Sequence, residues 1–211
     1  MTYNDAFKPE VAVMLQPLAC AIYAVDQLGD VRGATVAVLG QGPIGVLFSH
    51  VLKQRGAATV IGVDRIDRSD TAKTFGVDEV VHASSGRWAH SLTDAARPDV
   101  IIEAVGHQVS TLTHTIEAVR FGGRIFYFGV PDDPIYPFPM NTFLRKNLTL
   151  HAGFTVDRRR VLAEADVYLT EHPALTQGYL TDVYPARQAQ SAFQLASVPA
   201  RGQMKVVLSM V

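Results

Sequence analysis

The middle of the chain, residues 33–154, alternates short β-branched runs with amphipathic segments that have helical spacing. Runs such as Val36–Leu39 and Val100–Ile102 are apolar at every position, which is typical of strands covered on both faces. Strands that alternate with helices along a chain favour an α/β fold with a parallel, doubly wound sheet. The strands predicted from this pattern are 35–39, 59–63, 79–83, 99–104, 123–128 and 148–152.

Two segments flank this middle domain. Residues 1–32 form a helical lead-in, in which 9–28 are apolar on more than one face and Pro17 marks a break or a new first turn. Residues 155–211 form a C-terminal extension. The elements expected in it are a charged helix, a second helix and a strand, over 157–169, 186–196 and 203–208. We interpret the Arg158–Arg160 run as a solvated helix face, with an anion site as the less favoured alternative.

The composition is that of a globular chain without cross-links. Of 211 residues, 48% are hydrophobic and 18% are charged, and the single cysteine, Cys20, has no partner for a disulfide within the chain. Nineteen basic residues against 20 acidic ones give a net charge of -1, which argues against a nucleic-acid partner. We see neither a signal peptide nor an uncharged stretch long enough to cross a bilayer, so we expect a cytoplasmic protein without membrane contact.

The sharpest signal is Gly40-Gln-Gly42-Pro43-Ile44-Gly45, which follows the first strand and opens a helix. Gly40 permits a tight turn, Gly42 leaves room for a pyrophosphate against the backbone, and Gly45 lets the helix pack closely on the strand. Pro43 suits the first helical turn, and the free amides and positive end of the helix face the anion. The segment predicts the dinucleotide-binding loop of a Rossmann fold, with a merely structural glycine-rich turn as the alternative.

Asp64 ends the second strand, 19 positions after Gly45. An acid at this place accepts hydrogen bonds from both hydroxyls of the adenosine ribose, and it repels a 2′-phosphate. We therefore predict NAD as the cofactor. Arg65 and Arg68 stand beside the site, and because arginine accommodates a 2′-phosphate, NADP remains the less favoured alternative. The other interpretation of Asp64 is a solvated turn residue.

Two later strand ends, Glu103–Gly106 and Phe126–Pro131, fall where a cleft is expected at the switch point of such a sheet. Small residues and glycines there let a flat ring lie against the backbone. Each segment alone is equally consistent with an ordinary loop. Their joint position after the fourth and fifth strands favours a cofactor cleft.

Taken in order, these stretches resemble the cofactor-binding half of the zinc-type medium-chain dehydrogenases/reductases, which include alcohol, polyol and threonine dehydrogenases. The resemblance covers nearly the whole chain. It is carried by the glycine loop, Asp64, and the segments Leu15–Val25, Asp99–Gly106, Gly122–Ile125 and Gly202–Leu208. It implies an oxidoreductase that binds a nicotinamide dinucleotide and moves a hydride between that cofactor and an alcohol or carbonyl.

The resemblance also implies individual cofactor contacts. Gly42–Gly45 would hold the pyrophosphate, Asp64 would bind the adenosine ribose together with Arg68, and Lys205 would meet a phosphate. The residues expected to flank the adenine and nicotinamide rings are Val105, Gly106, Phe128, Gly129 and Val130.

The sequence departs from the family at the metal. Family members carry the catalytic zinc in an N-terminal domain, and this sequence starts near the place where that domain ends. Its seven histidines include no His-Glu pair and none lies near Cys20, while Gln16 stands where polyol-type members often have a glutamate. We therefore expect no zinc site in this chain and leave the catalytic residues unassigned. A truncated chain, a split subunit and a decayed enzyme fit equally well.

Two functions follow. The first is the NAD(H)-binding part of an alcohol or polyol dehydrogenase, active only when a catalytic domain or partner chain is supplied. The alternative is a non-catalytic NAD(H)-binding or interaction module, and zinc-free reduction ranks last. The apolar, proline-containing segment 135–150 suits the edge-to-edge homodimer common in the family. The terminal strand would leave an open edge, so we expect it to repack within the chain or against a partner.

Overall fold

The centre of the molecule is a parallel sheet in the order β3-β2-β1-β4-β5-β6, in a computed structural model that describes residues 7–210. This order reverses direction between β1 and β4, as in a doubly wound Rossmann fold, and confirms the predicted fold class. Each strand bound lies within one residue of its prediction. The strands are β1 (Thr35–Leu39), β2 (Thr59–Asp64), β3 (Glu79–His82), β4 (Val100–Glu103), β5 (Arg124–Tyr127) and β6 (Thr149–Ala152).

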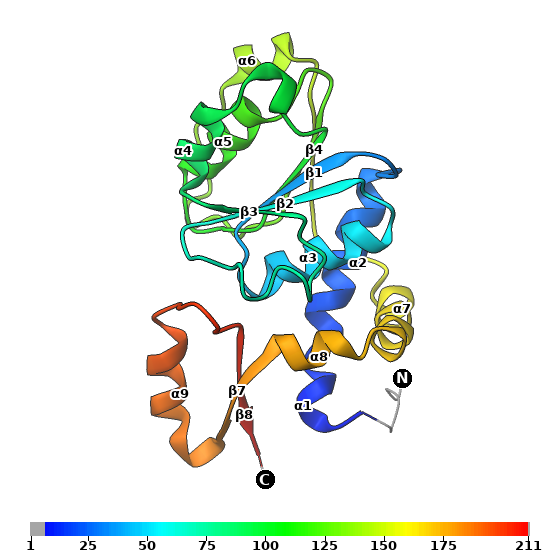
Figure 1. Cartoon of the computed structure of the whole chain (residues 1–211), viewed down its shortest axis with the longest axis vertical. Helices are drawn as coiled ribbons and strands as arrows, with labels where there is room; N and C mark the ends of the chain where they lie inside the picture. The colour runs from blue at the N-terminus through cyan, green and yellow to red at the C-terminus, as the bar shows by residue number, and fades with distance from the viewer. Residues whose placement is uncertain (1–6, 211) are drawn as a thin grey trace.

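Helices cover both faces of this sheet (Figure 1). Alternate positions of β1 point to opposite sides: Val36 and Val38 pack toward α2 and α3, and Ala37 and Leu39 pack toward α4 and α5. All four side chains are fully buried, which explains the continuous apolar character of this strand. The helices are α2 (Leu15–Leu28), α3 (Pro43–Gln54), α4 (Ser85–Ser91), α5 (Ser110–Ala118) and α6 (Met140–Arg145), and a 3-10 turn covers Asp94–Ala96.

The lead-in consists of the short helix α1 (Pro9–Ala12) followed by α2, and its first six residues lie outside the described part of the chain. Pro17 lies in the first turn of α2, so the interruption falls before it, after Ala12. The stretch Pro9–Leu28 is long and apolar enough to cross a membrane by length and composition, with a mean hydropathy of 1.5. In this structure 56% of it is buried inside the protein, as is usual for a core helix.

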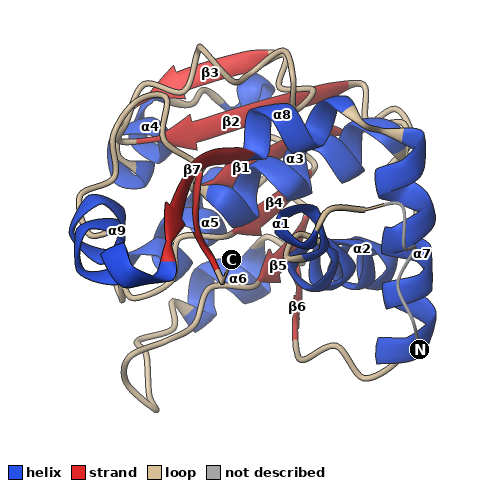
Figure 2. Ribbon diagram, turned by 90° about the horizontal axis from the view of Figure 1, so that it is seen from below, coloured by secondary structure: helices blue, strands red, loops and turns tan. Residues whose placement is uncertain are grey.

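The C-terminal extension supplies two more helices for the core and a separate small sheet (Figure 2). Helix α7 packs on α2, and β8 pairs in parallel with β7, so the terminal strand does repack within the chain. The predicted helices and strand are present. The sequence analysis missed β7 and α8, and residue 211 is outside the described part. The elements are α7 (Arg158–Glu171), α8 (Ala174–Tyr179), β7 (Leu180–Pro185), the 3-10 turn Ala186–Gln188, α9 (Ala189–Ala196) and β8 (Lys205–Ser209).

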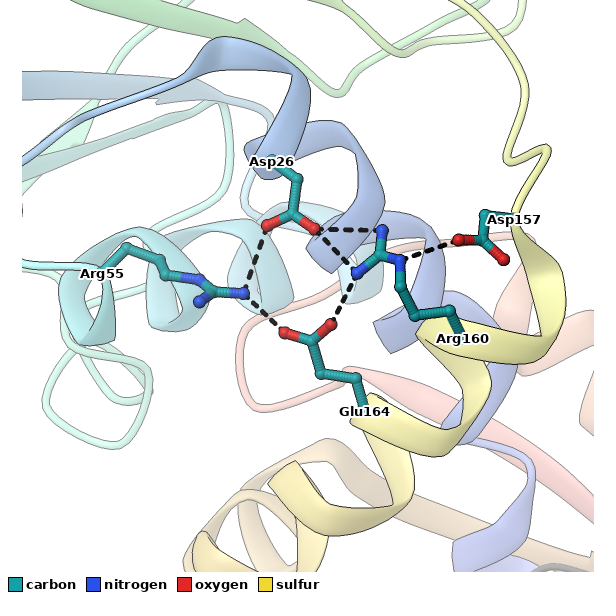
Figure 3. A network of polar contacts seen from close by, with 5 residues as sticks. All are labelled: Asp26, Arg55, Asp157, Arg160 and Glu164. Atoms are coloured by element: carbon teal, nitrogen blue, oxygen red, sulfur yellow. Dashed lines mark hydrogen bonds and ion pairs between the residues drawn. The ribbon is translucent and has the colours of Figure 1, made fainter.

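A network of ion pairs ties α7 to α2 and to the end of α3 (Figure 3). Asp26 and Glu164 both accept from Arg55, at 3.2 and 2.6 Å, and both also pair with Arg160, at 3.3 and 3.0 Å. Asp157 pairs with the same Arg160 at 2.9 Å. Within the described residues the last arginine of the Arg158–Arg160 run is therefore engaged in a network on the protein surface.

Candidate functional site

The turn between β1 and α3 has the backbone that its glycines allow. Gly40 has a φ of +85°, a left-handed conformation that favours glycine. A Cβ added to Gly45 would lie 1.7 Å from the carbonyl oxygen of Gly40, so the first turn of α3 packs against this loop only because Gly45 has no side chain. Gly42 is the N-cap of α3 and Pro43 its first residue. A Cβ on Gly42 would meet no atom within 4 Å, so the backbone here borders open space.

The positive end of α3 faces this open space. The first N–H groups of a helix have no intrahelical acceptor, and Pro43 contributes none, so the amides of Ile44 and Gly45 are the donors of this first turn. Aligned peptide dipoles add a partial positive charge at the same place. The turn is therefore a place where an anion such as a phosphate is stabilised by backbone groups alone.

Asp64 lies at the end of β2, next to the glycine turn. Its Oδ2 accepts the backbone N–H of Gln41 at 2.6 Å, and its Oδ1 accepts the N–H of Ile66 at 2.8 Å. These bonds fix the carboxylate beside the glycine turn. Gln41 itself is buried, and its side chain bonds the carbonyl of Val38 and the hydroxyl of Ser49. The sequence analysis missed Gln41, because nothing in the motif specifies the residue between the two glycines.

These groups line a cleft of about 690 Å³ between the carboxyl ends of the strands and the C-terminal extension. One wall contains the glycine turn and Asp64. The other consists of residues from the end of α9 to the start of β8, which the sequence analysis did not place here apart from Lys205. The lining residues are Gly40, Gly42, Pro43, Val63, Asp64, Arg65, Ile66, Arg68, Ala83, Ser84, Ser85, Ala104, Val105, Gln108, Ala196, Pro199, Gln203, Met204, Lys205 and Val206.

Three basic side chains line the cleft. Arg65 is exposed and Lys205 is half-buried, whereas Arg68 is only 4% exposed. The guanidinium of Arg68 donates to the carbonyls of Ala200 and Gln203, each at 2.8 Å. Among residues 7–210 none of the three cations lies within 4 Å of a carboxylate. The cleft thus carries positive charge without a paired anion.

The loops after β4 and β5 lie beside this cleft. Only Val105 of the five residues expected near the rings is part of the lining. Gly106 is buried with a φ of +64°, and a Cβ on it would lie 2.9 Å from the nitrogen of Val130. The ring of Phe128 packs edge-on against Phe48 of α3, with 5.0 Å between centroids.

The structure thus brings together eight of the predicted site residues in one cleft and places the others next to it. Those in the lining are Gly40, Gly42, Pro43, Asp64, Arg65, Arg68, Val105 and Lys205. Those outside it are Ile44, Gly45, Gly106, Phe128, Gly129 and Val130. Their roles stay predictions, because no ligand contact tests them.

The resemblance to zinc-type dehydrogenases implies a catalytic zinc, and residues 7–210 contain no fitting set of ligands for it. No group of three or more His, Cys, Asp or Glu residues is close enough to hold a metal. The thiol of Cys20 accepts hydrogen bonds from Gln16 at 3.0 Å and from Thr155 at 3.4 Å. We derive no chemical step through a metal.

Comparison with known proteins identifies the family. A model of the zinc-binding dehydrogenases matches residues 43–168. L-idonate 5-dehydrogenase (NAD(P)(+)) of Escherichia coli is 32% identical over 69% of this chain and 42% of its own length. L-threonine 3-dehydrogenase of Bacillus licheniformis is 30% identical over 97% of this chain and 60% of its own.

The fold comparison agrees. The solved structure of the alcohol dehydrogenase TADH from Thermus sp. ATN1 superimposes with a TM-score of 0.79 at 26% identity, over 93% of this chain and 58% of that one. The chain thus spans between about two fifths and three fifths of the length of these relatives. Because the family match covers more than half of its residues, this chain belongs to the zinc-binding dehydrogenase family.

Proposed function

We propose that this chain binds NAD(H) in the cleft described above, as the nucleotide-binding part of an alcohol or polyol oxidoreductase. The observation that carries the proposal is the hydrogen bond between Gln41 N–H and Asp64 Oδ2. It holds a carboxylate and the first turn of a helix in one cleft. A diphosphate and a ribose diol in one ligand match that pair of sites.

Each part of the cleft has a task in this proposal. The segment Gly42–Gly45 binds the pyrophosphate through the N–H groups of its residues other than Pro43, and Lys205 supplies a balancing charge from the opposite wall. Asp64 accepts from the adenosine ribose, with Arg68 beside it. The loops with Val105 and Gly106, and with Phe128 to Val130, flank the rings. Bound nicotinamide would give or take a hydride, and the task of this chain is to hold it in place.

We propose NAD as the preferred cofactor. Each oxygen of Asp64 accepts one backbone N–H, which leaves lone pairs on both oxygens for the two ribose hydroxyls. A 2′-phosphate would be repelled by the same carboxylate. Arg65 and Arg68 offset part of this repulsion, and the L-idonate relative is named for use of both cofactors, so NADP is the weaker ligand of the two.

Catalysis and assembly belong to the proposal for the whole protein. The relatives are named for the oxidation of L-idonate and L-threonine, which supports a hydroxylated small molecule as substrate class.

We also propose a homodimer through β6, the strand at the edge of the sheet. The segment before it exposes Ile135, Met140 and Leu144 at 83%, 61% and 67%. Light scattering at micromolar concentration would give twice the chain mass for such a dimer, and the single mass would contradict it.

Titration with NADH and NADPH, followed by nicotinamide fluorescence, tests the cofactor proposal. The unchanged chain should bind NADH more tightly than NADPH, and Asp64→Asn should weaken NADH binding about tenfold and reduce the preference. Asp78→Asn is the matched control, because Asp78 accepts a backbone N–H, that of Val60 at 2.8 Å, near the amino end of the same strand. Equal affinity for both cofactors in the unchanged chain would contradict the role of Asp64.

A further inference from the structure

The two loops at the carboxyl ends of β4 and β5 meet around a single buried carboxylate, that of Glu103. Its side chain is fully buried. One oxygen accepts the N–H groups of Val105 and Gly106, both at 3.2 Å. The other oxygen accepts the N–H of Gly129, also at 3.2 Å, and this N–H donates as well to the backbone carbonyl of Glu103 at 3.1 Å. One side chain therefore bonds to both loops that adjoin the cleft.

Glu103 has no cationic partner within the described residues, which makes its burial costly. Burial raises the pKa of Glu103, and the hydroxyl of Thr111 and the backbone N–H groups partly offset this effect. Burial, together with the charge of Glu103, also raises the pKa of neighbouring Tyr127 to about 12. An apolar side chain at this strand end would avoid this cost. The carboxylate therefore indicates that its oxygens are needed to accept the N–H groups of the two loops.

The loops approach Glu103 so closely that they need glycine at the point of contact. A Cβ on Gly129 would lie 2.3 Å from Oε2 of Glu103 and 2.3 Å from the nitrogen of Gly106. Gly106 and His107 both have positive φ, at +64° and +53°. His107 N–H then donates to the carbonyl of Val130 at 2.8 Å. The two loops are thus joined by contacts that begin at the carboxylate and end at Val130.

We propose that Glu103 is a positioning residue for the nicotinamide end of the cofactor, because it fixes the spacing of the two loops that flank the ring. This inference rests on the proposed binding of NAD(H). Glu103 touches no ligand in this account, and it acts through the backbones of Val105, Gly106 and Gly129. The adenosine and pyrophosphate end depends on Asp64 and the glycine turn, whereas the hydrogen bonds that the Glu103 carboxylate accepts come from Val105, Gly106 and Gly129.

The test compares two ligands that share the ADP-ribose portion and differ in the nicotinamide ring. In Glu103→Gln an amide NH₂ replaces one accepting oxygen and faces backbone N–H groups, so the loops must separate. We expect affinity for NADH to fall about tenfold or more, and affinity for ADP-ribose to change less than about twofold, by calorimetry. The fluorescence gain of bound NADH should fall as well, because a displaced ring is more exposed to water.

Asp99→Asn is the matched control. Asp99 precedes β4 at its other end, and its Oδ2 accepts the N–H of Thr35 at 2.7 Å. Its replacement should lower the unfolding midpoint without separating the two ligands. If Glu103→Gln lowers the affinity for both ligands equally, or for neither, the inference is overturned while the proposed NAD(H) binding stands. Failure of the unchanged chain to bind either ligand would instead overturn the proposed function.

A second measurement keeps the inference testable if Glu103→Gln does not fold. Amide hydrogen exchange in the unchanged, ligand-free chain, followed by NMR, reports on the N–H groups of Val105 and Gly106. Because the carboxylate of Glu103 accepts from both, we expect exchange as slow as that of neighbouring strand amides. Exchange at the rate of open loops would show that the carboxylate does not hold them, and would overturn the inference.

Discussion

The six-stranded sheet forms one wall of the cleft. The other wall, from the end of α9 to the start of β8, belongs to the small β7–β8 sheet, and different forces hold the two. The sheet is held by burial: Val36 to Leu39 are fully covered on both faces. In β7 and β8 the only buried side chain is that of Val207, and Val183 is 51% exposed. This second wall is attached by polar contacts from Arg68 to the carbonyls of Ala200 and Gln203, and by Met204, which is buried in the main core. The comparison teaches that one wall of the cleft is held by burial along whole strands, and the other by a few polar contacts and little burial.

The largest expected effect comes from a substitution in the first wall, at the glycine turn. Gly45→Ala places a Cβ 1.7 Å from the carbonyl oxygen of Gly40, so the first turn of α3 must move. We expect a loss of about 3 kcal/mol in the free energy of unfolding, measured by urea denaturation, together with loss of NADH binding. Gly42→Ala is the control, since its Cβ meets no atom within 4 Å. It should leave stability nearly unchanged and weaken only binding, and equal destabilisation by both variants would contradict this view of the turn.

The same substitution in each wall gives the direct comparison. Val38→Ala removes two methyl groups from a fully buried position in β1, and we expect a loss of about 2 kcal/mol in the free energy of unfolding. Val183→Ala removes the same groups from a half-exposed position in β7, and the loss should stay below about 1 kcal/mol. Urea denaturation measures both. Similar losses would show that the two walls are equally well packed.

A pH titration probes the joint between the C-terminal extension and the sheet domain, where Tyr168 of α7 contacts His50 of α3. His50 is buried there, with its Nδ1 2.6 Å from the hydroxyl of Tyr168. Burial, and then the charge of His172, lower the pKa of His50 to about 4. An unfolded histidine has a pKa of about 6.5, so between these values the unfolded chain binds more protons. This contribution to stability is complete above about pH 7 and falls by about 3 kcal/mol toward pH 4.

Urea denaturation at pH 7 and pH 4.5 checks this expectation. The chain with His50→Asn should lose less stability on acidification than the unchanged chain. The same replacement at His82, which is exposed, is the control and should leave the pH dependence unaltered. If His50→Asn and the unchanged chain respond equally to acid, the buried histidine does not control the joint.

The smallest effect concerns the ion pairs at the same joint. Glu164→Gln removes the contacts with Arg55 and Arg160 (Figure 3). The side chains are between 33% and 47% exposed, so we expect a loss of about 0.5 kcal/mol at low salt. The difference from the unchanged chain should vanish in 1 M NaCl, and a difference that persists there would show that the network is not screened as a surface network should be.

The same contrast decides what could be predicted from the sequence. The central strands β1, β2 and β4 are apolar at most positions, and the glycine turn has a fixed order of residues, so local pattern was enough for both. The strand β7 was missed because its residues Leu180–Pro185 mix exposed and half-buried positions and include a proline. Its partner β8 begins 20 positions after it ends, and the pairing depends on contacts that no local pattern reports.

Long-range contacts also explain what was missed in the cleft. Arg68 was assigned to the ribose by the family resemblance, and the structure shows that its guanidinium also holds the turn at Ala200–Gln203. That contact joins residues more than 130 positions apart, which no spacing rule covers. The N–H groups that donate to Glu103 likewise depend on the positive φ of Gly106 and His107, a property of the folded loop.

The most direct test of the central claim is a crystal structure of the chain with NADH. The account predicts the pyrophosphate at the first turn of α3, and both hydroxyls of the adenosine ribose within hydrogen-bond distance of Asp64. The cleft left empty at saturating NADH, or the cofactor bound at another place, would contradict it.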